Sequence, residues 1–406
     1  MLACFFCGVS YVFVERCDTI DKENDAECME SRGMEAYMIN KERVLDIFLN
    51  YVQIDSESGN EKEMAERLRD DLQALGLRVK TDHAGEGFGS NGFNVCGYLE
   101  GTLPGEPTIL CAHMDTVAPG NGIRPIVENG IVHTDGSTIL GADDKSGVAA
   151  IMEAVQTIVE KKLPCRSAEI LFTIGEDCGL EGAKHMDYSM VKGKEALVFD
   201  HHGPIGTVMN QAPGHYRVHA EVIGRASHAG IAPEKGINAI QVMAKAIAKM
   251  NLMRIDEETT CNISMMQSNY ATNIVPEHAE FLAEIRSHSK EKLDAQAEHM
   301  RSCLQEACDE MGAQFKYEVS VTFGNFNLEE SDPLMQRVKQ SCERLGYPFI
   351  MERGGGGSDA NIMVLHGIKP LIVGCGMEKV HTGDEYVEIE DLHKTSMLIV
   401  DFLTGK

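Results

Sequence analysis

Residues 108–117 read TILCAHMDTV, an apolar run that ends in a histidine and an aspartate, and this stretch decides the fold. Apolar runs of the same kind recur as AEILFTIGED (168–177), EALVFD (195–200) and PLIVGCG (370–376). An amphipathic helical pattern, SGVAAIMEAVQTIVEKK (146–162), lies between two of them. Near-continuous apolar strands separated by helices are typical of a mostly parallel sheet that is covered on both faces. The sequence therefore predicts an α/β fold.

A second pattern begins near Gln211, where polar and apolar residues start to alternate. Half-exposed strands and amphipathic helices are predicted there in the order strand, helix, strand, helix, strand, at 215–224, 237–250, 277–286, 289–311 and 314–323. We interpret residues 211–324 as an inserted α+β, ferredoxin-like domain. The first pattern resumes after it, so we expect residues 34–210 and 325–406 to form one split catalytic domain.

The composition excludes several classes of function. The formal charge of −26 disfavours nucleic acid as a partner, because phosphate binding requires clustered Lys and Arg. No run approaches the roughly 20 apolar residues of a membrane-spanning helix, so no membrane partner is expected. Thirteen cysteines scattered over the chain do not form a disulfide framework, and the CxxC of Cys4 and Cys7 lacks the second pair of a structural zinc site.

The first 33 residues differ from the rest of the chain. Their apolar patch lacks the basic start and the small-residue cleavage site of a signal peptide. We interpret residues 1–33 as a disordered or wrongly assigned extension, and we expect a cytoplasmic protein.

Residues that can bind metal ions follow the apolar segments at five places, which are His113, Asp143, Asp177, Asp200 and His381. Each has an ordinary alternative: a histidine on a buried strand can be structural, and an aspartate before a helix can be a cap. As a set they lie where open α/β sheets bind ligands, beyond the carboxyl ends of the strands. Imidazole and carboxylate ligands suit a pair of zinc, cobalt or manganese ions that share one carboxylate.

The motifs of other hydrolases are absent. The chain has no GxSxG nucleophile elbow and no HExxH helix. The glycine-rich GGGGS (354–358) lacks the GK[ST] of a phosphate-binding loop. A two-metal hydrolase is therefore the interpretation that the residues favour.

Five motifs together resemble the co-catalytic metallopeptidases of the M20 family, and within it the peptidase T branch and its relatives. They are CAHMDTV (111–117), TDGSTILGADDKSGVAAIMEA (134–154), GEDCGLEGAK (175–184), RASHAGIAPEKGINAI (225–240) and VHTGDEY (380–386). The resemblance runs from about Met38 to the C-terminus. It implies that His113 and Asp200 bind one ion, that Asp177 and His381 bind the other, and that Asp143 bridges them.

The resemblance also implies catalytic roles. Glu176 would be the general base, which takes a proton from the attacking water and delivers it to the leaving amine. Asp115 would orient His113, since residues i and i+2 of a strand share a face. The peptide bond between Asp143 and Asp144 is expected to be cis.

The same resemblance implies a function for the inserted domain. In similar enzymes His228 reaches the active site of the other subunit of a dimer and stabilises the tetrahedral oxyanion. A homodimer is therefore expected. Asn273, Arg286, Arg353 and Gly356 match positions that bind the backbone or the carboxylate of the substrate, and a guanidinium suits a carboxylate.

The chain departs from the family pattern at two places. The family usually has Glu-Glu where this chain has Glu176-Asp177, and the shorter aspartate can weaken one metal site or change its preference. Ser268-Asn269 replace the Gly-Gly that commonly precedes TNIVP (272–276), which affects the domain near the substrate.

The expected function is metal-dependent hydrolysis of the N-terminal peptide bond of short peptides, tripeptides first, with two divalent ions per subunit. Zn²⁺ is the preferred ion, with Mn²⁺ or Co²⁺ as alternatives. A dipeptidase or an N-acyl amino acid amidohydrolase is the alternative activity, and a non-catalytic metal- or peptide-binding homologue is the alternative class. A shell-forming aminopeptidase of a related family is disfavoured, because it would leave SHAGIAPEKGINAI (227–240) unexplained.

Overall fold

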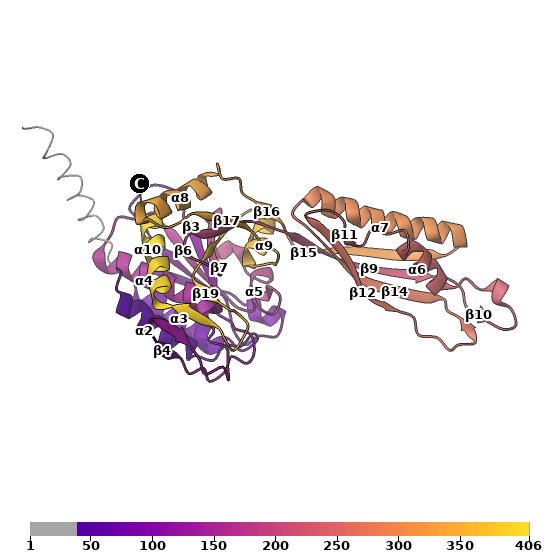
Figure 1. The fold of residues 1–406 in the computed structure, drawn as a ribbon, viewed down its shortest axis with the longest axis horizontal. Coiled ribbons are helices and arrows are strands. Elements are labelled where there is room, and N and C mark those ends of the chain that lie inside the picture. The colour runs from indigo at the N-terminus through magenta and orange to yellow at the C-terminus, as the bar shows by residue number, and fades with distance from the viewer. Residues whose placement is uncertain (1–38, 406) are drawn as a thin grey trace, which may run out of the picture. The chain divides into compact units, whose positions relative to one another are not determined.

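A computed structural model of the 406-residue chain describes residues 39–405, and Figure 1 shows it as a ribbon. The extension predicted at residues 1–33 lies outside the described residues. Two sheets organise the described part, one of nine strands and one of five. No helix in this part of the chain has the length and apolarity needed to cross a membrane.

The nine-stranded sheet contains the strand that decides the fold, β3 (Thr108–His113), at its centre. β3 runs parallel to its neighbours β6 and β7, and β7 runs parallel to β18. The strands at both sides of this centre pair antiparallel, apart from β17, which runs parallel to β8. The prediction of a mostly parallel α/β sheet is confirmed. Its strands lie in the order β1 (Arg78–Thr81), β2 (Val95–Leu99), β6 (Ala168–Thr173), β3, β7 (Glu195–His201), β18 (Lys369–Gly374) and β8 (Thr207–Ala212). Both β16 (Phe326–Asn327) and β17 (Ile350–Arg353) pair with β8.

Helices cover the sheet because its strands are apolar on both faces. α4 (Ala142–Lys161) packs on β3 and β7 and is buried along most of its length, including charged residues such as Asp144 and Glu153. α2 (Lys41–Val52) and α10 (Ile389–Thr404) pack against α4, and α9 (Asp359–Met363) contacts β7 and β18. Figure 1 shows the strands between the layer of α4 and α10 and the layer of α5 (Glu181–Lys184) and α9.

Further helices lie at the margins of the sheet. α3 (Lys62–Ala74) packs on β1 and β2, and α8 (Pro333–Leu345) packs on α10. Single 3₁₀ turns occupy Ala84–Gly87, Tyr188–Met190, Pro233–Lys235 and Val364–His366. Gly76 follows α3 and takes the left-handed conformation (φ 83°) that commonly ends a helix.

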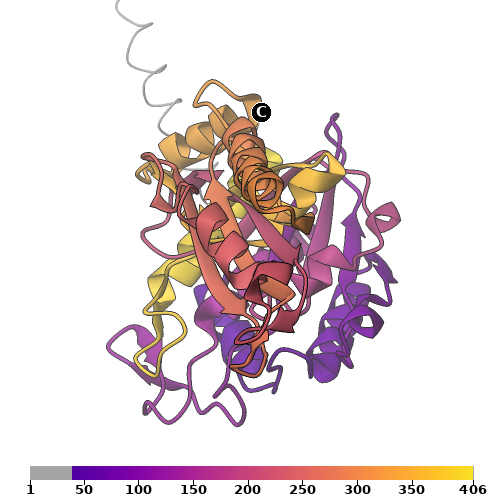
Figure 2. The same cartoon turned by 90° about the vertical axis from the view of Figure 1, so that its right-hand side faces the viewer.

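The five-stranded sheet is antiparallel and carries two helices, α6 (Ala239–Ile247) and α7 (Lys290–Met311). Figures 1 and 2 show both helices on one side of it, where they bury apolar residues such as Val218, Phe281 and Leu304. The strand order is β11 (Met253–Arg254), β12 (Thr259–Gln267), β14 (His278–Ser287), β9 (Gly214–Ile223) and β15 (Gln314–Phe323).

The sequence of elements in this domain is β-α-β-β-α-β, the ferredoxin-like arrangement. The prediction from periodicity contained only three of its strands and omitted β12. That strand lies at the side of the sheet, next to the two-residue β11, and only two of its nine residues are buried, so its apolar alternation is weak.

Two small sheets complete the described residues. One pairs β10 (Ser227–His228) with β13 (Ile274–Val275). The other has the order β19 (Met377–Glu378), β20 (Tyr386–Glu388), β5 (Ile131–His133) and β4 (Ile126–Glu128). The connection between β19 and β20 carries His381, so this small sheet positions one of the predicted metal ligands.

Candidate metal centre

His113 is the last residue of β3, and its surroundings fix the orientation of its ring. Its backbone N–H donates to Asp144 Oδ2 at 3.1 Å. Its Nδ1 lies 3.1 Å from the backbone oxygen of Asp115 and 3.4 Å from Asp115 Oδ1. These acceptors favour the tautomer with the proton on Nδ1, which leaves the Nε2 lone pair free to bind a metal ion.

Asp143 lies between two imidazoles. Its Oδ1 is 3.0 Å from His113 Nε2, and its Oδ2 is 3.1 Å from His381 Nε2. A carboxylate that presents one oxygen to each of two histidines has the geometry of a ligand shared by two ions. The peptide bond from Asp143 to Asp144 is cis, as the resemblance implied.

The two remaining predicted ligands extend this arrangement in opposite directions. Asp177 Oδ1 lies 3.0 Å from His381 Nε2, and Asp200 Oδ1 lies 3.9 Å from His113 Nε2. Asp143, Asp177 and His381 each offer a ligand atom within 4.8 Å of the others. The structure thus brings all five predicted ligands together, although they come from five separate segments of the chain.

Burial and the neighbouring histidines shift the pKa values of the acids in the cluster. Burial raises the pKa of Asp200 to about 8 and raises the pKa of Asp177 above its ordinary value. Burial would also raise the pKa of Asp143, but His113 and His381 hold it well below its usual range. Asp177 Oδ2 is buried and has no hydrogen-bond partner in the described residues. Two imidazole nitrogens and three largely buried carboxylates, one of them with an oxygen that lacks a hydrogen-bond partner, form a ligand set that suits divalent cations.

Asp115 connects the histidine to the segment that carries the predicted base. Its Oδ1 accepts the backbone N–H of Glu176 at 3.0 Å, and its Oδ2 accepts the N–H of Asp177 at 3.2 Å. Ser58 Oγ donates to the same Oδ2 at 2.7 Å. Burial, with Asp200 nearby, raises the pKa of the Glu176 carboxyl well above its usual range. Asp115 therefore positions both His113 and Glu176 relative to the cluster.

Glu385 is a part of the site to which the sequence analysis gave no role. It is almost fully buried, and its Oε2 accepts the backbone N–H groups of Leu140 and Gly141 at 2.7 and 2.8 Å. Its Oε1 accepts the N–H of Asp143 at 2.9 Å. The position of Glu385, four residues after His381 within the motif VHTGDEY, is the sequence feature that could have pointed to its role. One loop therefore supplies a predicted ligand and also holds the segment that carries the bridging aspartate.

Lys145 is a second residue to which the sequence analysis gave no role. It is fully buried and directly follows Asp143 and Asp144 in the chain. Its Nζ donates to the backbone oxygen of Ile54 at 2.9 Å. Burial lowers the pKa of Lys145 to about 8, and its hydrogen bond fixes the chain that follows α2.

The predicted residues of the inserted domain lie in two places. His228 ends β10 and Asn273 directly precedes β13, and the N–H of Ala229 donates to the backbone oxygen of Asn273 at 2.9 Å. Arg286 lies on β14 with its guanidinium 3.3 Å from Glu284. Within residues 39–405, no hydrogen bond or ion pair joins these residues to the predicted ligands.

Arg353 and Gly356, the other two predicted substrate residues, lie outside the inserted sheet. Arg353 is the last residue of β17 and is exposed, and Gly356 follows in an open loop. In the described part of the chain, neither forms a hydrogen bond or ion pair with the predicted ligands. The structure therefore assembles the metal cluster but does not bring the predicted substrate residues to it.

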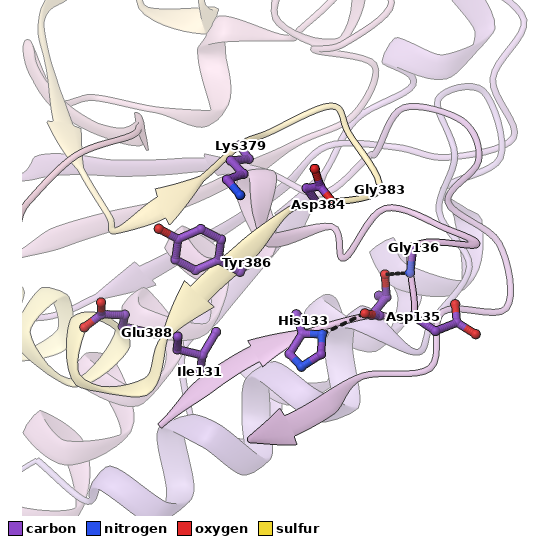
Figure 3. Close-up of a pocket in the computed structure, with 10 residues that line it drawn as sticks. Ile131, His133, Asp135, Gly136, Lys379, Gly383, Asp384, Tyr386 and Glu388 are labelled. Atoms are coloured by element: carbon purple, nitrogen blue, oxygen red, sulfur yellow. Dashed lines mark hydrogen bonds between the residues drawn. The ribbon is translucent and has the colours of Figure 1, made fainter. Parts of the chain in front are cut away.

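A hollow of about 370 Å³ borders the loop that carries His381. Figure 3 shows Lys379, Asp384 and Tyr386 from the β19–β20 hairpin, and Ile131 and His133 from β5. One wall of the hollow is thus formed by the β19–β20 segment, which also carries the predicted ligand His381 and Glu385.

The fold and this cluster are those of a metal-dependent hydrolase. Comparison with known proteins agrees with this class: the profile of the peptidase dimerisation domain matches residues 210–312, and the profile of peptidase family M28 matches residues 94–218. The uncharacterized protein YqjE of Bacillus subtilis is 41% identical over 363 residues, which cover 89% of this chain and 98% of that protein.

Two solved structures are similar over nearly the whole described chain. The aminopeptidase PepT from Bacillus cereus has a TM-score of 0.82 and 39% identity, and it covers 90% of this chain and 99% of its own. A tripeptidase from Staphylococcus aureus has a TM-score of 0.79 and 35% identity, with 90% and 98% covered. The chain belongs to the M20 family of metallopeptidases, in its peptidase T-like branch.

Proposed function

We propose that this metallopeptidase removes the N-terminal residue from short peptides, tripeptides first. The position of Asp143, with one oxygen toward His113 and the other toward His381, is the observation that carries the proposal. It provides for two adjacent divalent ions, for which Zn²⁺ is the preferred species and Mn²⁺ or Co²⁺ the alternatives. The similar proteins named aminopeptidase PepT and tripeptidase support the choice of substrate.

In this proposal His113 and Asp200 hold one ion, Asp177 and His381 hold the other, and Asp143 serves both. Divalent ions in such a site polarise the scissile carbonyl and make a water more acidic. Glu176 takes a proton from the attacking water and transfers it to the nitrogen of the leaving amine. Asp115 keeps Glu176 in place through the backbone N–H that it accepts.

The inserted domain completes the site in a homodimer. We propose domain limits of 34–210 with 325–406 for the catalytic domain and 211–324 for the inserted domain. His228 of the partner subunit would donate a hydrogen bond to the oxyanion, and Asn273, Arg286, Arg353 and Gly356 would bind the peptide. The dimerisation-domain match at 210–312 supports this assembly. The cytoplasmic location stays a prediction.

The decisive experiment uses the purified full chain loaded with Zn²⁺ or with Mn²⁺. Di-, tri- and tetrapeptides with free amino termini are compared with their N-acetylated forms and with N-acetyl amino acids. Release of only the first residue, fastest from tripeptides, is the expected result. Hydrolysis of the acetylated substrates alone would replace the proposal by an amidohydrolase, and two bound ions without any turnover would indicate a binding protein.

A further inference from the structure

His201, His202 and Glu352 form a cluster of metal-binding side chains that shares no residue with the site described above. Each offers one ligand atom, and these atoms lie within 4.8 Å of one another. His201 Nε2 is 3.1 Å from Glu352 Oε2, and the two imidazole rings have their centroids 4.3 Å apart. Among the groups of this kind in the described residues, this one alone lacks a member of the predicted ligand set.

The sheet explains how these residues meet. His201 is the last residue of β7, His202 follows it, and Glu352 lies on β17. Two strands, β18 and β8, lie between β7 and β17 in the sheet, and the residue of β18 opposite His201 is Gly374. Because a glycine brings no side chain, β18 places nothing of its own between the imidazole and the glutamate at this position.

We propose that His201, His202 and Glu352 bind a third divalent cation, with Zn²⁺ as the preferred ion. Three protein ligands with a water in the fourth position are a common arrangement for zinc. Zinc bonds to nitrogen and oxygen measure about 2.0–2.1 Å, so tetrahedral ligands lie about 3.3 Å from one another. The 3.1 Å between His201 Nε2 and Glu352 Oε2 is close to that spacing and to the 3.0–3.1 Å separations around Asp143.

Exposure sets the accessibility of this site. His201 is buried, whereas the side chain of Glu352 is 46% exposed and His202 is also exposed. An ion can therefore enter from solvent, and a water can complete its coordination. The open side and the single carboxylate make this site weaker than the buried pair, so it fills at higher free zinc.

Occupation would connect two segments that each carry a residue predicted to act in catalysis. His201 follows Asp200, a predicted ligand, and Glu352 precedes Arg353, a predicted substrate residue. An ion shared by His201 and Glu352 would hold the end of β7 to the end of β17. The site is thus placed to fix Arg353 relative to the metal pair, although the inference does not depend on the substrate proposed above.

The test measures the zinc bound per chain by the purified full-length protein in buffers of increasing free Zn²⁺. We expect a ratio that rises to three in the wild type and stops at two in His202→Ala and in Glu352→Gln. His219→Ala is the matched control, because His219 pairs with Glu280 at 2.7 Å but, among the described residues, belongs to no group of three metal-binding side chains. This variant is expected to keep the ratio of three.

The outcomes separate the third site from the pair. A wild-type ratio that stops at two, or a ratio of three that survives both ligand substitutions, overturns the inference and leaves the proposed catalytic site intact. In His381→Ala, which removes a ligand of one ion of the pair, we expect a ratio of two, and adding Glu352→Gln to this variant should lower the ratio to one. Unfolding midpoints measured without metal should be equal in wild type, His202→Ala and Glu352→Gln, which shows that a lost ion reflects a lost ligand.

Discussion

The substitution Glu385→Gln tests how the predicted bridging aspartate is held. The glutamate accepts three backbone N–H groups, two on Oε2 and one on Oε1. A glutamine amide has only one oxygen. If that oxygen keeps the N–H groups of Leu140 and Gly141, the amide NH₂ faces the N–H of Asp143, so two donors meet in a buried place. An unsatisfied buried donor costs about 1–3 kcal/mol, and we expect the free energy of unfolding to fall by about that amount.

The same change should weaken metal binding. Asp143 loses the hydrogen bond that fixes its backbone, and loss of a residue that orients a ligand typically lowers metal affinity about 10–100-fold. Zinc affinity is measured by competition with a chromophoric chelator, and stability by urea unfolding of the metal-free protein. Glu388→Gln is the control, since Glu388 is exposed at the end of β20, the strand that directly follows Glu385. Wild-type affinity and stability in Glu385→Gln would refute the proposed role of this residue.

Three further substitutions, with one control, test other parts of the structure. Glu176→Gln should lower kcat by about 10²–10⁴-fold while the zinc content of the protein stays the same, because the proton carrier is lost and the ligands are kept. Asp177→Glu restores the usual family residue, and comparison of activity with Zn²⁺ and Mn²⁺ should show a changed metal preference; equal ratios for both proteins would mean that the shorter side chain has no effect. Arg43→Met should destabilise the fold by about 2–4 kcal/mol in urea unfolding, because it leaves the buried Glu153 without its partner. Lys41→Met, at an exposed ion pair, should change stability by less than about 1 kcal/mol.

The sequence predicted the metal cluster because its chemistry is local to strand ends. His113, Asp177 and Asp200 each follow or end an apolar run, and the carboxyl ends of parallel strands meet at one edge of a sheet. The role of Glu385 could not be predicted in this way. Its partners are backbone N–H groups more than 240 residues away in the chain, and no residue type marks a backbone donor. Such a contact depends on the conformation of two loops, which periodicity does not describe.

The inserted domain shows the same limit. Its buried strands β9 and β14 alternate clearly, so they were predicted, whereas the exposed β12 was not. The predicted substrate residues raise a different difficulty. His228 was assigned to the active site of a partner subunit, and one chain alone contains no information on that contact. Geometry within the subunit therefore supports the metal ligands and leaves the substrate residues as predictions.

The cluster also connects folding with metal binding. The fold buries Asp143, Asp177 and Asp200 close together, and burial raises the pKa of Asp200 to about 8 because a carboxylate there loses its hydration. Fixed contacts such as those of Asp115 and Glu385 hold this arrangement, so the fold itself bears the cost of assembling like charges. Two divalent ions would neutralise these charges and would provide a partner for Asp177 Oδ2, which has none among residues 39–405. The unfolded chain cannot offer the same converging ligands, so ions that bind the folded state stabilise it. The clustered carboxylates that disfavour the metal-free fold are therefore also the source of its affinity for metal.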